Sequence, residues 1–163
     1  MSGMKKNEKQ PREPRKQCGA LPFRIDDAGR IEVLLVTSRE THRWVIPKGW
    51  PIRKLRANQT AAREAYEEAG LAGAVSKEPY GVYNYEKRLK SRAFVACAVD
   101  VFLMQVEKEQ KRWPERDERE RRWFDPQTAA ELVDEPELSD LIAALPERLA
   151  DAAAPRAKRA AGG

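Results

Sequence analysis

Three glutamates in the middle of the chain, Glu64, Glu67 and Glu68, are spaced so that they share one face of a helix. Like charges on one face repel, and Arg63 can neutralise only part of them, through a pair with Glu67 four residues on. A hard divalent cation would relieve the rest, because Mg²⁺ prefers oxygen ligands and can orient phosphates and activate a bound water. A solvated acidic face is the alternative, and for this short pattern alone it is the simpler interpretation.

The residues around these glutamates predict a helix that ends at Gly70. Small residues recur along it at spacings of three and four, namely Ala61, Ala62, Ala65 and Ala69. Such a stripe lets a helix pack closely on a sheet. Asn58 or Thr60 would cap the start of the helix, and Gly70 is a natural C-terminal stop.

The rest of the chain alternates between candidate strands, loops and helices. Residues 18–25 and 31–38 flank the turn-like segment 26–29, so we expect a β-hairpin. Further strands are expected at 44–47, 80–86, 93–106 and 122–124, a long solvated loop at 107–122, a short helix from Pro126 and an amphipathic helix from about Pro136 to Asp151. Strands interrupted by one central helix and closed by another predict an α/β sandwich with a mixed sheet.

Composition favours one domain at residues 18–151 between two basic tails. Residues 1–17 carry a net charge of +4 and residues 152–163 carry +3, so −2 remains for the segment between them. The tails are poor in large apolar residues, which predicts disorder. We expect no nucleic-acid partner except through these tails, whose binding would depend steeply on salt.

No apolar run reaches membrane-spanning length, and the first ten residues lack the apolar stretch of a signal peptide. We therefore expect a cytoplasmic protein without a membrane partner. Cys18 and Cys97 are too few for a disulfide framework or a cysteine-based zinc site, so reduced thiols are expected.

The glutamates belong to a longer pattern, made by Gly49, Arg63, Glu64, Ala65, Glu67, Glu68, Gly70 and Leu71. This pattern resembles the Nudix box, G-x5-E-x7-R-E-U-x-E-E-x-G-U, in which U is an aliphatic residue. One position departs, because Leu55 stands where the box has its first glutamate. In that family this glutamate supports the arginine and the loop, so Leu55 is expected to weaken the loop or one metal site without abolishing activity.

The resemblance covers about residues 18–150 and implies the Nudix α/β/α sandwich, in which the box forms a loop–helix–loop that binds Mg²⁺ or Mn²⁺. It implies a pyrophosphohydrolase, in which water attacks phosphorus in a diphosphate linked to another group. Carried over, the pattern makes Glu67 and Glu68 metal ligands and Glu64 a ligand or the water-activating base. Arg63 would orient the carboxylates, and the Gly49 carbonyl would complete the metal shell.

The lead-in Arg43–Gly49 resembles the branch of the family that cleaves diphosphoinositol polyphosphates and diadenosine polyphosphates, as do Trp113–Glu115 and Arg121–Phe124. Substrates with many phosphates need many donors, usually Arg and Lys. Two basic clusters flank the predicted metal site: Lys48, Arg53, Lys54 and Arg56, and Lys87, Arg88, Lys90 and Arg92. For any one of these cations a solvated surface role is the simpler interpretation.

We therefore expect an enzyme that acts on a diphosphoinositol polyphosphate or a dinucleoside polyphosphate. Another nucleoside diphosphate derivative, including a capped RNA 5′ end, is the alternative within the enzyme class. A Nudix-fold sensor that binds such ligands without cleaving them is the alternative outside it. Leu55 favours the sensor, and the intact set of three glutamates argues against it.

Other residues carry weaker signals. His42 is the only histidine, which excludes a histidine-pair metal site, and a surface role is expected. Glu118 or Glu120 is a candidate loop base, although salt bridging within the charged loop is the simpler interpretation. Three tryptophans are candidates for stacking on a nucleobase: Trp44, Trp50 and Trp113. Of these, Trp44 is expected to pack in the core.

Overall fold

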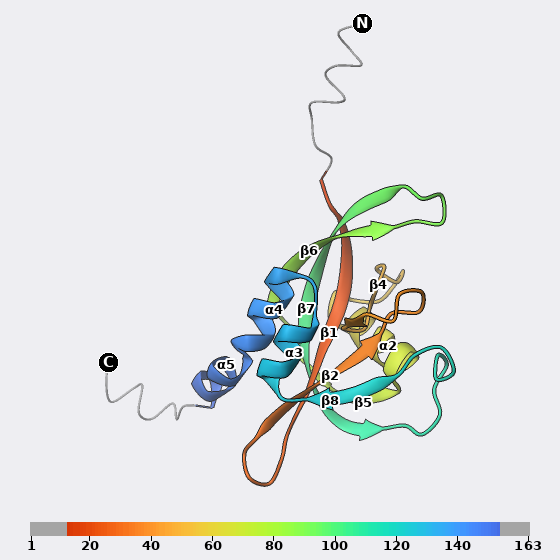
Figure 1. Ribbon diagram of the computed structural model, residues 1–163. Coiled ribbons are helices and arrows are strands. Elements are labelled where there is room, and N and C mark those ends of the chain that lie inside the picture. The colour runs from red at the N-terminus through yellow and green to blue at the C-terminus, as the bar shows by residue number, and fades with distance from the viewer. Residues whose placement is uncertain (1–12, 154–163) are drawn as a thin grey trace, which may run out of the picture.

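The computed structural model describes residues 13–153, which form a mixed sheet between two helical layers (Figure 1). The strands are β1 (Arg15–Ile25), β2 (Ile31–Thr37), β3 (Trp44–Val45), β4 (Lys48–Gly49), β5 (Leu71–Val75), β6 (Gly81–Arg88), β7 (Phe94–Glu109) and β8 (Arg121–Phe124). The helices are α2 (Ala57–Ala69), α3 (Pro126–Leu132), α4 (Pro136–Ala143) and α5 (Leu145–Ala152). This arrangement confirms the predicted α/β sandwich with a mixed sheet.

Two long strands, β1 and β7, pair in parallel at the centre of the sheet, from Arg15↔Cys97 to Phe23↔Gln105. The free edge of each strand is divided between two antiparallel partners. β1 pairs with β4 near its start and with β2 near its end, whereas β7 pairs first with β6 and then with β5. Because the partners separate, β4 and the β6–β7 hairpin stand apart from the β2–β8 end of the sheet.

The strands bury alternate side chains on opposite faces, as the period of two requires. Leu21, Val33 and Val99 face α3, α4 and α5, in a core that also contains Leu138 and Ile142. The neighbouring side chains face α2, in a second core that includes Ala20, Leu34, Val36, Phe102 and Met104. Figure 1 shows α2 on one side of the sheet and the three C-terminal helices on the other.

Helix α2 lies directly on the sheet through the predicted stripe of small residues. Ala61, Ala65 and Ala69 have no solvent exposure, and Gly70 ends the helix in the left-handed conformation, with φ 67° and ψ 32°. The start of the helix differs from the expectation, because the cap is Arg56 rather than Asn58 or Thr60. The Arg56 backbone N–H donates to the Gln59 side chain at 2.8 Å. Gln59, in the first turn of the helix, thus provides the acceptor for the N–H of the cap residue.

Two other boundaries differ from the sequence expectation. β1 begins at Arg15, so the predicted tail is wrong for residues 15–17, which pair with Cys97–Val99 of β7. The rest of the predicted N-terminal tail before residue 13, and the C-terminal tail beyond residue 153, lie outside the described residues. The expected single helix from 136 to 151 is divided into α4 and α5, because Pro146 has no N–H to donate to the preceding turn.

The predicted solvated loop at 107–122 is also wrong over part of its length. β7 continues to Glu109, β8 begins at Arg121, and the segment between them is anchored on α2 rather than free in solvent. Trp113 and Arg119 in this segment are partly buried. Among residues 13–153, none of the helices combines the length and apolar character that crossing a membrane demands.

We expect Gly70→Ala to destabilise the fold more than Gly29→Ala does. Both glycines have positive φ, which costs a residue with a Cβ about 1–2 kcal/mol. A Cβ at Gly70 would also lie 2.8 Å from Trp113 Cδ2, whereas a Cβ at Gly29 would meet nothing within 4 Å. Urea unfolding of both variants measures the difference, and equal losses of stability would contradict the steric contribution at Gly70.

Candidate active site

Helix α2 brings Glu64 and Glu68 to the side of the helix that faces β4. The Glu64 carboxyl lies so close to Gly49 that a Cβ on Gly49 would collide with it. The Glu68 side chain is 7% exposed, and its carboxyl is in hydrogen-bonding contact with that of Glu64. The structure therefore brings Gly49, Glu64 and Glu68 together, and the absence of a side chain at Gly49 permits the close approach; their role as a metal site stays a prediction.

Glu67 lies on the outer side of this cluster and accepts from Arg63 Nε at 3.2 Å, as the i,i+4 spacing predicts. Both side chains are partly exposed, at 60% for Arg63 and 35% for Glu67. Within residues 13–153, no three His, Cys, Asp or Glu side chains are grouped closely enough to hold a metal ion by themselves. The oxygen donors of Glu64 and Glu68 nevertheless suit Mg²⁺, which is usually held by one or two carboxylates, several waters and substrate phosphates.

Burial raises the pKa values of the two inner glutamates. Desolvation raises the pKa of Glu68 to about 8, against the favourable charges of Arg119 and Lys48. Desolvation and the charge of Glu67 raise the pKa of Glu64, although the contact with Glu68 lowers it. A cation placed between these carboxylates would stabilise their ionised forms and so lower both pKa values.

The segment between β7 and β8 supplies two charged residues that the sequence did not single out for the site. Arg119 lies 3.8 Å from Glu68 Oε1 and donates to Glu115 Oε1 at 2.6 Å and to the Thr37 carbonyl at 3.0 Å. Glu115 lies near enough to Glu64 for its charge to raise the pKa of that carboxyl. The only sequence signal for either residue was the Trp113–Glu115 tripeptide, because a mixed-charge loop gives no indication of which charges turn inward.

The two loop glutamates that the sequence offered as candidate bases, Glu118 and Glu120, lie elsewhere. Glu118 pairs with Arg39 at 3.4 Å in an exposed position, as the salt-bridge interpretation predicts. Glu120 is exposed, and its backbone bonds to Thr37. Neither lines the cleft described below. Glu115 does not line it either, but it reaches the carboxylate cluster through its ion pair with Arg119 and its proximity to Glu64.

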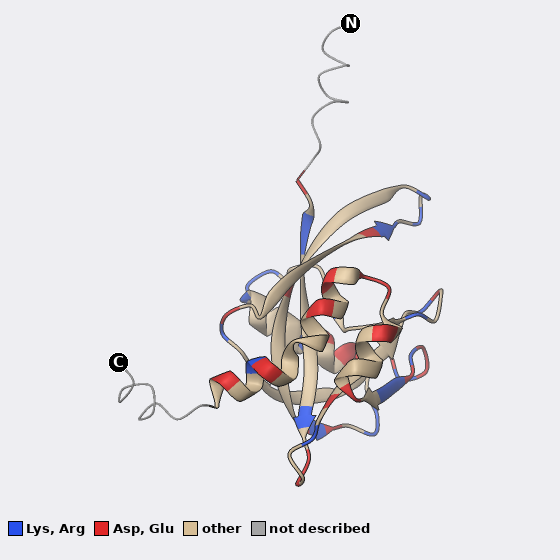
Figure 2. Ribbon diagram, turned by 60° about the vertical axis from the view of Figure 1, so that its left-hand side comes forward, with Lys and Arg blue, Asp and Glu red and all other residues tan. Residues whose placement is uncertain are grey.

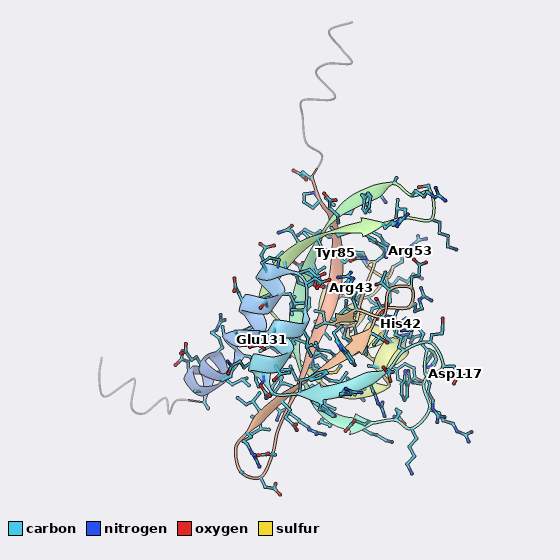
Figure 3. All side chains as sticks on the ribbon, viewed as in Figure 1. His42, Arg43, Arg53, Tyr85, Asp117 and Glu131 are labelled. Carbon is cyan, nitrogen blue, oxygen red and sulfur yellow. The ribbon has the colours of Figure 1, made fainter. Side chains whose placement is uncertain are left out.

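A cleft of about 380 Å³ opens next to Glu68. Six cations line it: Arg39, Arg43, Lys48, Lys87, Arg88 and Arg119. Arg43 is held by Asp134 at 2.9 Å and by Glu135 at 3.3 Å, so its charge is partly compensated. Figure 3 labels Arg43 and Tyr85, which both line this cleft.

The predicted substrate cations are divided by this geometry. Lys48 and Arg88 line the cleft, whereas Arg53, Lys54 and Arg92 do not, and a substrate role for these three stays a prediction. The β6–β7 hairpin carries the second basic cluster to its tip, which is blue in Figure 2. Positively charged side chains therefore continue outward from the carboxylate end of the cleft.

Aromatic side chains line the cleft near the hairpin. Phe94 is 62% exposed although it lies on a strand, and Tyr85 donates to Gln17 Oε1 at 2.6 Å. The sequence did not single out Phe94. Trp44 packs edge-on against Phe124, with 5.1 Å between the ring centroids, as a core role predicts. Neither Trp50 nor Trp113 lines the cleft.

The remaining predictions concern His42 and the cysteines. His42 is exposed, with φ 53°, in the turn between β2 and β3, and Figure 3 labels it; it does not line the cleft. Cys18 and Cys97 are both buried free thiols, as predicted.

A model of the NUDIX domain matches residues 15–145 of the chain. The Arabidopsis thaliana protein Nudix hydrolase 13, mitochondrial, is 33% identical over 132 residues, which cover 70% of this chain and 64% of that relative. Diphosphoinositol polyphosphate phosphohydrolase 3-alpha of mouse is 30% identical over 122 residues, covering 73% of this chain and 69% of its own length. The crystal structure of an Ap4A hydrolase from C. elegans is 20% identical, with a TM-score of 0.61 over 84% of this chain and 99% of that one.

The chain belongs to the Nudix family. Nudix hydrolases generally use divalent metal cations, which agrees with the oxygen donors of Glu64 and Glu68. The likeness to the Ap4A hydrolase structure supports the fold. Because the match spans only 64% of the Arabidopsis relative, which is named as mitochondrial, activity and cellular location stay predictions for this chain.

In the presence of a chelator, we expect the free energy of unfolding of the wild type to fall as the pH rises. Glu68→Gln should not show this loss of stability, because glutamine has no proton to release. The folded pKa of Glu68 is raised from 4.5 to about 8. The folded state therefore binds this proton more tightly than the unfolded state, and stability falls as the pH rises through that window.

Urea unfolding with a chelator at about pH 5 and about pH 8 measures this effect. The gain in stability of Glu68→Gln over the wild type should be larger at the higher pH. Glu131→Gln is the control, because Glu131 is exposed on α3 and does not line the cleft (Figure 3). A gain that shrinks with rising pH would contradict the assignment.

Proposed function

We propose that this protein hydrolyses a phosphoanhydride bond in a polyphosphorylated metabolite, with Mg²⁺ or Mn²⁺ held by Glu64, Glu67 and Glu68 beside Gly49. The observation that carries the proposal is the cleft, which is lined by six cations and by Glu68, the member of the carboxylate cluster that reaches it; Glu40 and Glu86 are the other acids in its lining. Carboxylates alone would repel a phosphate chain, and cations alone would bind it without activating water. Their juxtaposition suits a substrate that is both highly anionic and cleaved at phosphorus.

Different residues around the site would have different roles in the hydrolysis. When bound, the metal would polarise phosphate oxygens and lower the pKa of a coordinated water. Lys48 and Arg119 lie at the carboxylate end and would neutralise the phosphates nearest to it. The oxygen of the attacking water would bond to phosphorus while the bond to the bridging oxygen breaks. Glu64 is the candidate to accept the proton of that water, because burial already raises the pKa of its carboxyl.

The outer part of the cleft would hold the remaining phosphates. Lys87 and Arg88 line it, and among residues 13–153 neither takes part in an ion pair, so both remain available to an anion. Diphosphoinositol polyphosphates and dinucleoside polyphosphates are the substrate classes that match this number of cations. A similar relative is named as a diphosphoinositol polyphosphate phosphohydrolase, and a similar structure as an Ap4A hydrolase.

One observation bears on the choice between the two substrate classes. The exposed ring of Phe94 lines the cleft next to the unpaired cations, and an aromatic face at this place suits a nucleobase better than an inositol ring. The second candidate function is a sensor that binds such ligands without cleaving them. Leu55, 39% exposed in the loop before α2, keeps that candidate open.

We expect Glu67→Gln to lower metal-dependent turnover by about a hundredfold or more while leaving the fold intact, because Glu67 is partly exposed and packs in neither core. The assay supplies Mg²⁺ and a panel of diadenosine polyphosphates, a diphosphoinositol phosphate, a capped RNA, nucleotide sugars and nucleoside triphosphates, and measures released product. Glu131→Gln is the matched control and should keep wild-type turnover. If the protein binds these ligands but turns over none of them, the hydrolase proposal is wrong and the sensor proposal is favoured.

We expect Phe94→Ala to raise KM about fivefold or more for dinucleoside polyphosphates, since stacking of one base contributes about 1–3 kcal/mol. KM for a diphosphoinositol substrate should stay unchanged. Val82→Ala is the control, because Val82 is 45% exposed on the adjoining strand β6 and does not line the cleft. Equal effects of Phe94→Ala on both substrate classes would contradict a base-stacking role.

A further inference from the structure

The stretch from Gln110 to Arg121, which connects β7 to β8 and includes the first residue of β8, caps the C-terminal end of α2 at four consecutive carbonyls. The Glu115 N–H donates to the Glu67 carbonyl at 3.0 Å, and Trp113 Nε1–H donates to the Glu68 carbonyl at 3.0 Å. Arg121 donates to the Ala69 carbonyl at 2.7 Å, and the Gln110 N–H donates to the Gly70 carbonyl at 2.8 Å. The last carbonyls of a helix have no partner within the helix, and here one distant segment satisfies them in order.

Trp113 is the centre of this cap. Its ring lies against Gly70, where a Cβ would approach it to 2.8 Å, and the Arg121 guanidinium lies 4.0 Å from its ring centroid. Arg121 also donates to the Gln110 carbonyl at 2.7 Å, which closes the segment on itself. Neither Trp113 nor Arg121 lines the cleft, so neither is placed to touch a substrate there.

The capped carbonyls belong to the residues whose side chains make the site. Glu67 and Glu68 lie in the last turn of α2, where a helix end without caps frays. The hydrogen bond from Trp113 therefore acts on the backbone of Glu68 itself. The same segment returns to the cluster through Arg119, which contacts both Glu115 and Glu68.

We propose that Trp113 is a positioning residue, whose indole N–H holds the Glu68 backbone so that the Glu68 carboxylate is set for the divalent cation. The inference rests on the proposed function, because it takes Glu68 as a metal ligand. Groups that orient metal ligands from behind typically change metal affinity or activity by about 10–100-fold when they are lost. A residue that only stabilised the fold would lower the melting temperature without changing the affinity of the folded protein for the cation.

The chain contains a matched control for the test. Trp123 on β8 donates its Nε1–H to Glu109 Oε1 at 3.1 Å and has the Arg24 guanidinium 4.1 Å from its ring centroid. Its surroundings thus resemble those of Trp113, but its acceptor is an exposed side chain and it does not line the cleft. Trp113→Phe and Trp123→Phe each keep an aromatic ring and lose one indole donor.

The experiment titrates the full-length variants with Mn²⁺ and follows the free ion by electron paramagnetic resonance, with thermal unfolding recorded in a chelator. We expect Trp113→Phe to weaken Mn²⁺ binding about tenfold and Trp123→Phe to leave it unchanged. In a Glu68→Gln background, Trp113→Phe should weaken binding no further, because the ligand that it positions is already gone. Turnover of Trp113→Phe should show a lower kcat with little change in KM.

Equal Mn²⁺ affinity of the wild type and Trp113→Phe would overturn the inference while leaving the proposed function in place. Additive effects of Trp113→Phe and Glu68→Gln would overturn it in the same way. If Trp113→Phe does not fold, Trp113→Leu replaces it, since leucine also lacks the indole N–H that donates to the Glu68 carbonyl. A wild type whose Mn²⁺ binding is absent, or is unchanged by Glu67→Gln and Glu68→Gln, would refute the proposed function and this inference together.

Discussion

Close packing of α2 on the sheet sets the position of every carboxylate in the site. Ala61, Ala65 and Ala69 are fully buried against the strands, and side chains this small let the helix axis approach the sheet. Glu64 and Glu68 follow two of these alanines by three residues, so the same rotation of the helix carries both carboxyls toward β4. Larger residues in the stripe would lift the helix and separate Glu64 from Gly49.

This packing has an electrostatic cost that the surrounding structure offsets. Two carboxyls withdrawn from water favour their protonated forms, and the pKa values of Glu64 and Glu68 rise accordingly. Lys48 and Arg119 oppose that rise at Glu68, and the contact of Arg119 with Glu115 keeps this guanidinium at the cluster. A divalent cation would stabilise the ionised carboxylates further, so binding of the cation and deprotonation of the site are linked.

The cleft depends on how the sheet divides. β1 and β7 remain paired over nine residues, but their outer partners separate, and the β6–β7 hairpin extends away from the body (Figure 1). The α3–α4 connection contributes to the opposite wall by holding Arg43 through Asp134 and Glu135. One oxygen of Glu135 is buried without a hydrogen-bond partner among the described residues. The cationic walls therefore come from segments far apart in sequence, which a polyphosphate chain would bridge.

Local patterns determined much of this protein in advance. Runs of apolar residues predicted β2, β6 and β7, the alanine stripe predicted the buried face of α2, and Gly70 predicted its end. Spacing along one helix brought Glu64, Glu67 and Glu68 together, because residues three and four apart share a face in any helix. Only the tertiary structure decided which of the three turns inward, and which charges of the 110–120 segment join them. Arg119, Glu115, Trp113 and Phe94 reach their places through strand pairing and helix capping between distant segments, and neither leaves a periodic signal in the residues themselves.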